Sequence, residues 1–259
     1  MTTFQLNYIG PMSDRPRYYA NDGSRDFLAL DPHVIEIEDG RSRPQPPALE
    51  EEGFALIANK SAVRDFGNDA EINRVYGRET QQLLQGLTGA DEVVLCSKPV
   101  RRTTETSRLT ATEALYNARP ANFVHVDISN ATAAAMAEHL QPKTPIKRFA
   151  HYNLWRPYSA PPQDMPLALC DLRSVSASDL VEADAMMDIP GKKESSYEGL
   201  VVRYNPRHRW SYFSGMNRDE MLVFKTEVPH AAFNNKAGPS GLPPRASIEM
   251  RAIAYWYSD

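Results

Sequence analysis

The chain has 259 residues, of which 42% are hydrophobic, so it can form one domain with a full core and is not a disordered chain. Its 29 basic and 33 acidic residues are interspersed and give a net charge of -4, which argues against nucleic acid as a partner. We expect no membrane partner, because no apolar run is long enough to span a bilayer. Two distant cysteines without metal-type spacing indicate a reducing compartment, and we expect a cytoplasmic protein.

The first third of the chain has a mixed pattern. Strands are predicted over 4–9, 34–38 and 53–57, and a loop over 11–23. The clearest helix is predicted over 69–87, where Asp69 can cap the first turn. Its apolar face comprises Ile72, Val75, Tyr76, Thr80, Leu83, Leu84 and Leu87.

The remaining two thirds of the chain contain mostly short apolar or alternating runs separated by Pro, Gly, Asn and Ser turns. We expect one helix over 131–140, and strands over 92–96, 147–155, 167–170, 199–204, 210–213, 221–225 and 247–257. Many short strands with few helices predict a mainly β fold, a jelly roll with flanking α-helices. We expect residues 1–259 to form one domain, in which 1–95 supplies N-terminal strands and a helix that packs on the jelly-roll core.

Three residues far apart in the chain form a candidate metal set: His125, Asp127 and His230. In His125-x-Asp127 the alternation of a strand points both side chains to one side, with Val126 facing away. Two imidazoles and one carboxylate on one face of Fe(II) leave positions open for oxygen and a second ligand, as in the non-haem iron oxygenases. The sequence therefore predicts these three residues as metal ligands and as the catalytic centre.

The C-terminal run offers a binding site for a carboxylate. Strand parity puts Arg245, Ser247, Glu249 and Arg251 on one face, and Ile248, Met250 and Ala252 on the other. A guanidinium and a hydroxyl on one strand can hold a carboxylate through a bidentate pair and an added hydrogen bond. We predict Arg245 with Ser247 as the cofactor-binding pair. Arg251 is a rival for this role, and Glu249 can pair with either arginine.

Three further residues are candidates for binding the substrate. Trp155 and Arg156 could line the pocket and hold an acidic or amide group, although a tryptophan in a strand is more often part of the core. Arg101, with its neighbour Arg102, could do the same, although such charged pairs usually face solvent.

A series of motifs runs in order along nearly the whole chain, and it is more specific than any single tripeptide. It includes Asp39-Gly40-Arg41, Tyr76-Gly77-Arg78-Glu79, Val124-His125-Val126-Asp127, Asn153-Leu154-Trp155-Arg156-Pro157, Pro229-His230-Ala231-Ala232-Phe233 and Pro244-Arg245-Ala246-Ser247. In this series the chain resembles the fungal and bacterial family of small 2-oxoglutarate-type hydroxylases and desaturases of secondary metabolism, which includes the cephalosporin 7-alpha-methoxylase small subunit.

The resemblance implies a double-stranded β-helix, which is a cupin-like jelly roll, with Fe(II) held by His125, Asp127 and His230. It also implies a non-haem iron oxidoreductase, a 2-oxoglutarate-dependent dioxygenase that oxidises a small metabolite with O2 by hydroxylation, desaturation or ring closure. The chain departs from the family at Ser97–Arg101 and Ile128-Ser129, near the expected pocket mouth.

Two other functions stay open on the sequence. One is a non-catalytic, metabolite-binding partner subunit of a biosynthetic enzyme, although a pure scaffold has no need for an intact set of three ligands. The other is a cupin-like isomerase or hydrolase that uses the same metal without oxygen. Besides a small-molecule substrate, the partners considered are a second copy of the chain in a homodimer and another biosynthetic enzyme.

Overall fold

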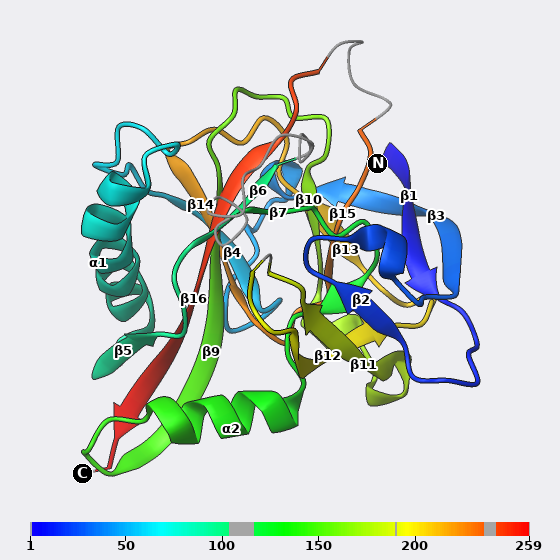
Figure 1. Cartoon of the computed structure of the whole chain (residues 1–259). Coiled ribbons are helices and arrows are strands. Elements are labelled where there is room, and N and C mark those ends of the chain that lie inside the picture. The colour runs from blue at the N-terminus through cyan, green and yellow to red at the C-terminus, as the bar shows by residue number, and fades with distance from the viewer. Residues whose placement is uncertain (1, 104–116, 190, 236–241, 259) are drawn as a thin grey trace.

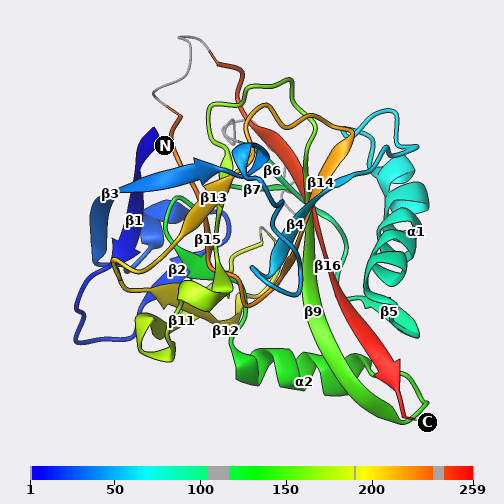
Figure 2. The ribbon, with the colours of Figure 1, turned by 180° about the vertical axis from the view of Figure 1, so that it is seen from behind.

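The computed structural model describes residues 2–103, 117–189, 191–235 and 242–258. In this part of the chain, strands outnumber helices and form two curled sheets that face each other, with α1 and α2 on the outside (Figure 1). The long strands β9 and β16 run side by side, and the N-terminal strands lie at the far end from α1 (Figure 2).

The helices are α1 (Asp69–Thr88) and α2 (Asn130–Leu140). The strands are β1 (Thr2–Ile9), β2 (Arg17–Tyr19), β3 (Leu30–Asp39), β4 (Phe54–Ala58), β5 (Glu92–Leu95), β6 (Val100–Thr103), β7 (Asn117–Ala118), β8 (His125–Val126), β9 (Ile146–Pro157), β10 (Leu167–Cys170), β11 (Leu180–Met187), β12 (Ser195–Val202), β13 (Trp210–Tyr212), β14 (Glu220–Lys225), β15 (His230–Ala232) and β16 (Ala246–Tyr257).

The two sheets differ in the number and order of their strands. The larger one has the order β1-β3-β13-β10-β15-β8-β12-β11-β2, and the smaller one has β4-β14-β9-β16-β6-β7, with β5 also paired to β16. Most neighbours in both sheets are antiparallel, and β8 and β15 are adjacent although about a hundred residues separate them in the chain. The sheets therefore bring distant segments together in the space between them.

Helix α1 packs on the outer face of the smaller sheet. Its buried residues Ile72, Tyr76 and Leu84 contact a cluster that includes Ile248 and Met250 of β16. The side chain of Asn68 accepts the hydrogen bond that caps the helix, so the predicted cap at Asp69 is wrong by one residue. Leu87, predicted on the apolar face, is 39% exposed, because it lies in the last turn, beyond the edge of the sheet contact.

Four strands were not predicted: β2, β6, β7 and β11. Arg17–Tyr19 forms β2 inside the expected loop 11–23, where it pairs in parallel with β11. Strand β11 alternates between apolar and polar residues over 181–185 and pairs with the next strand, β12, so its local pattern was present and was missed. Strands β2, β6 and β7 are short and depend on pairing with other segments, which local residue patterns do not report.

The predicted fold class is confirmed, since the structure is mainly β with helices that flank curled sheets. Among the described residues, no helix is both long and apolar enough to cross a membrane.

Candidate metal centre and its two cavities

The register of the larger sheet brings the predicted metal ligands together. His230 of β15 lies directly opposite His125 of β8 in an antiparallel pair, so the two imidazoles share one face of the sheet. Their ring centroids are 4.3 Å apart. Asp127 follows β8, and one ligand atom from each of the three buried residues lies within 4.8 Å of the others. The spacing suits a single metal ion on one face of a His-Asp-His set.

Backbone carbonyls orient both imidazoles. Nδ1 of His125 lies 3.0 Å from the carbonyl oxygen of Phe123, and Nδ1 of His230 lies 3.0 Å from that of Val228. Since a carbonyl only accepts hydrogen bonds, this geometry assigns the proton of each neutral ring to Nδ1. Each Nε2 is left facing Asp127, at 3.8 Å from a carboxylate oxygen.

The electrostatics of the site keep His125 and Asp127 deprotonated. Burial, followed by the neighbouring His230, lowers the pKa of His125 to about 3, so this ring is neutral near pH 7. Burial alone would raise the pKa of Asp127. The positive charge of Arg251 and the two imidazoles outweigh that effect and hold the pKa well below its usual range. Neutral imidazoles and an ionised carboxylate are the forms that bind a metal.

The Asp127 carboxylate is held from two sides. Arg251 donates from Nη2 to Oδ1 at 2.7 Å, and the amide of Asn153 donates to Oδ2. The Nε of Arg251 also donates to Glu249 at 2.9 Å. Asn153 was not predicted as a site residue. Its signal in the sequence is a polar residue between apolar Tyr152 and Leu154 in the middle of a strand.

Arg245 lies on the other side of the imidazoles, at a small cavity with about 310 Å³ of empty space. The cavity is lined by Arg102, Ala121, His125, Trp155, Leu167, His230, Ala232, Arg245 and Glu249. The guanidinium of Arg245 is buried and donates from Nη1 to the Met165 carbonyl at 2.8 Å. Its Nε has no hydrogen-bond partner among the described residues, and no carboxylate there forms an ion pair with it.

Burial, with a contribution from Arg102, lowers the pKa of Arg245 to about 9. A buried cation without a paired anion is unfavourable, so a carboxylate brought into this cavity would stabilise the charged guanidinium. Ser247 is fully buried, and its hydroxyl donates to the Arg102 carbonyl at 3.4 Å, outside the set of residues that line the cavity.

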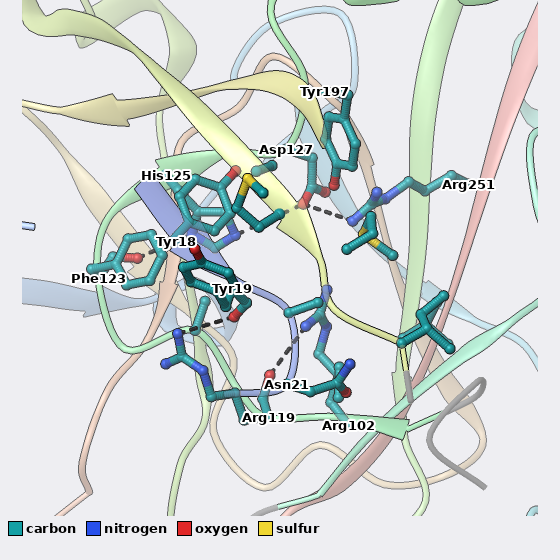
Figure 3. Close-up of a pocket in the computed structure, with 18 residues that line it drawn as sticks. Tyr18, Tyr19, Asn21, Arg102, Arg119, Phe123, His125, Asp127, Tyr197 and Arg251 are labelled. Carbon is teal, nitrogen blue, oxygen red and sulfur yellow. Dashed lines mark hydrogen bonds and ion pairs between the residues drawn. The ribbon is translucent and has the colours of Figure 1, made fainter. Parts of the chain in front are cut away.

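A larger cavity, with about 750 Å³ of empty space, opens beside His125 and Asp127 (Figure 3). Tyr18 and Tyr197 form parts of its wall, and Arg251 points across it toward Asp127. It is mainly apolar with a few polar groups, which is typical of sites that bind small organic molecules. Arg102 and His125 line both cavities.

The structure divides the predicted substrate-binding residues. Trp155 lines the small cavity, opposite Glu249 in the sheet register. Arg156 and Arg101 both lie opposite Ile248, whose side chain packs under α1, so they face away from the metal centre.

The guanidinium of Arg156 donates to the carbonyls of Asn59 and Arg218. That of Arg101 donates to the carbonyls of Phe66 and Gly67. Neither residue joins the site.

Comparisons with known proteins agree with the fold and the site. A family model described as "Oxidoreductase/YMDC permease-like domain" matches residues 6–255, and the chain belongs to this family. The hydroxylase/desaturase efuI of Hormonema carpetanum is 28% identical over 280 residues, covering 97% of this chain and 94% of that protein. The alpha-ketoglutarate-dependent dioxygenase phiK of a fungal species (strain ATCC 74256) is also 28% identical, covering 96% and 94%.

Among solved structures, the iron and alpha-ketoglutarate-dependent endoperoxidase NvfI superposes with a TM-score of 0.82 at 21% identity, covering 99% of this chain and 98% of that one. This likeness confirms the jelly-roll fold. The resemblance predicted from the motifs is confirmed, and the chain is an oxidoreductase related to the fungal Fe(II)/2-oxoglutarate-dependent oxygenases of secondary metabolism. The relatives named by activity are enzymes, which favours an enzyme over a non-catalytic partner subunit.

Proposed function

We propose that this chain oxidises a small metabolite at an Fe(II) centre held by His125, Asp127 and His230, with 2-oxoglutarate and O2 as co-substrates. The proposal rests on one observation: two Nε2 atoms and a carboxylate, all buried, converge within 4.8 Å while both Nδ1 atoms are bonded to the backbone. Such a donor set fits Fe(II) and leaves coordination positions free. Iron and 2-oxoglutarate, when bound, supply the oxygen-activating chemistry.

Arg245 is the proposed anchor for 2-oxoglutarate. It is buried beside both histidines and lacks an anionic partner among the described residues, whereas Arg251 already binds Asp127 and Glu249. A guanidinium can form a bidentate pair with the far carboxylate of the co-substrate. Trp155 and Leu167 line the same cavity and would exclude water from that pair.

The larger cavity is the proposed substrate site. It meets the metal centre at His125 and Asp127, so a molecule held there lies beside the proposed iron position. Tyr18 and Tyr197 provide rings and hydroxyl groups for packing and hydrogen bonds, and Arg102 adds a positive charge.

The wider setting is also part of the proposal. We treat residues 1–259 as one oxygenase domain in the cytoplasm, where the free thiols of Cys96 and Cys170 would stay reduced. For a homodimer, or for pairing with another biosynthetic enzyme, Leu30 and Val34 offer apolar side chains on one face of β3, 45% and 73% exposed.

The test is conversion of 2-oxoglutarate to succinate by the purified protein after anaerobic loading with Fe(II) and admission of air. We expect succinate from the wild type and none above background from His230→Ala. Absence of iron-dependent succinate in the wild type would contradict the proposal. A reaction that proceeds under nitrogen would instead favour an isomerase or hydrolase.

A further inference from the structure

Asn153 lies in β9 of the smaller sheet, and its side chain points toward the metal site. In the smaller sheet it pairs with Arg251 of β16 on one side and with Phe224 of β14 on the other. The ring of Phe224 lies 5.0 Å from that of His230, which shows that this face of the sheet looks toward the metal ligands. Asn153 is fully buried. Its two neighbours in the strand face the other side of the sheet and belong to the apolar core beneath α1.

Both ends of the Asn153 amide are bonded. Its nitrogen donates to Oδ2 of Asp127, and its oxygen accepts from the Thr226 hydroxyl at 2.6 Å. An ionised carboxylate only accepts hydrogen bonds, so the amide must turn its NH2 group toward Asp127. Thr226 is held in turn, because its backbone N–H donates to the His151 carbonyl at 3.0 Å. The donor-to-acceptor direction of the two hydrogen bonds, from Thr226 to Asn153 and from Asn153 to Asp127, is therefore fixed.

The two groups that hold Asp127 differ in charge. Arg251 supplies a positive charge at Oδ1, which stabilises the anion but also repels a cation placed nearby. Asn153 supplies a neutral donor at Oδ2, which sets the rotation of the carboxylate without that repulsion. An apolar residue of similar size would fill the same space but would leave Oδ2 without its donor.

We infer that Asn153, held by Thr226, is a positioning residue that fixes the rotation of the Asp127 carboxylate toward the two imidazoles. The inference rests on the proposed function, because it concerns the same metal centre. A purely structural role would make Asn153 important for folding but not for the affinity or the geometry of the metal site. Metal binding, measured without turnover, separates the two roles.

The experiment is an anaerobic titration with Co(II), followed by its visible absorption, on the wild type, Asn153→Ala and Thr226→Val. We expect Asn153→Ala to weaken Co(II) binding about 10- to 100-fold and to change the absorption spectrum. Thr226→Val removes one hydrogen bond and should weaken binding by about two- to tenfold. Thermal unfolding without metal reports any separate loss of stability.

Asn205→Ala is the matched control. The Asn205 amide donates to the carboxylate of Asp179 at 3.1 and 3.2 Å, a similar bond outside the metal site, so this variant should bind Co(II) like the wild type. Wild-type affinity and spectrum in Asn153→Ala, or in Thr226→Val if the first variant does not fold, would overturn the inference. Absence of Co(II) and Fe(II) binding by the wild type would instead contradict the proposed function.

Discussion

The two cavities beside His125 each contain an arginine from the C-terminal segment, but the two arginines are in different states. Arg251, at the larger cavity, is bonded to Asp127 and Glu249. Arg245, at the smaller one, is buried without an ion-pair partner among the described residues. The comparison shows that two arginines predicted on one strand face can have different partners. The partners already present indicate which guanidinium is available for a ligand.

The largest effect is expected at the three proposed metal ligands, each of which lines at least one of the two cavities. His125→Ala, Asp127→Ala and His230→Ala should each abolish Fe(II) binding and turnover, because each removes one of three proposed ligands. Metal content and succinate formation measure this, and circular dichroism checks that the fold is kept. Normal iron affinity in any one variant would remove that residue from the site.

Asp127→Glu is a finer test of the same centre. It keeps the charge but moves the carboxylate by about one methylene, while a functional site must hold its geometry to roughly 0.5 Å. Turnover should fall steeply, measured as succinate formed per iron bound. Turnover near that of the wild type would mean that the Asp127 carboxylate is not a ligand.

Arg156 tests whether burial alone makes an arginine part of the site. Arg156→Ala leaves the carbonyls of Asn59 and Arg218 without their charged donor and should lower the free energy of unfolding by about 2–4 kcal/mol. Because this guanidinium lies on the far face of the sheet, the affinity for 2-oxoglutarate should not change. Urea unfolding and anaerobic titration measure the two effects. A large loss of 2-oxoglutarate affinity in the folded variant would place Arg156 in the site after all.

The smallest effect is expected at the start of α1, far from both cavities. Asn68→Ala removes the side chain that accepts from the Glu71 N–H and should cost about 1 kcal/mol of stability. Asp69→Ala is the comparison, because Asp69 is not the cap, although its carboxylate does pair with Arg101. Equal metal affinity is expected in both variants. A larger loss of stability in Asp69→Ala would restore Asp69 as the main stabilising residue of this helix start.

Much of the architecture could be predicted from local patterns. The helical spacing of α1 and the alternation along β16 are properties of the segments themselves, and both elements lie where the sequence places them. Strand β2 has only three residues and is held by its parallel pairing with β11, which a local pattern does not contain.

The candidate site shows the same division. The His125-x-Asp127 tripeptide alone occurs by chance, and the three proposed ligands could be identified because His230, the C-terminal arginine and serine, and the ordered series of motifs accompany it. Trp155 and Arg156 were proposed together for the pocket, but adjacent residues of a strand point to opposite faces, so at most one could line it. The same parity separates Arg102, which lines both cavities, from Arg101, which does not. Asn153 begins one of the motifs quoted above, but the motif assigns no function to it, and its hydrogen bond to Asp127 is visible only when β9 is placed opposite Asp127.

The most direct test of the difference between the two arginines is a titration of 2-oxoglutarate into Fe(II)-loaded protein under anaerobic conditions, following the charge-transfer absorbance of the chelate. Arg245→Ala should weaken 2-oxoglutarate binding by about 2–4 kcal/mol, roughly thirty- to thousand-fold. Arg245→Lys should recover only part of this affinity, since an ammonium cannot form the bidentate pair with a carboxylate. Arg251→Ala should have a much smaller effect on 2-oxoglutarate. Weakened binding in Arg251→Ala alone would contradict the assignment of Arg245, and unchanged binding in both variants would remove the main support for 2-oxoglutarate as the co-substrate.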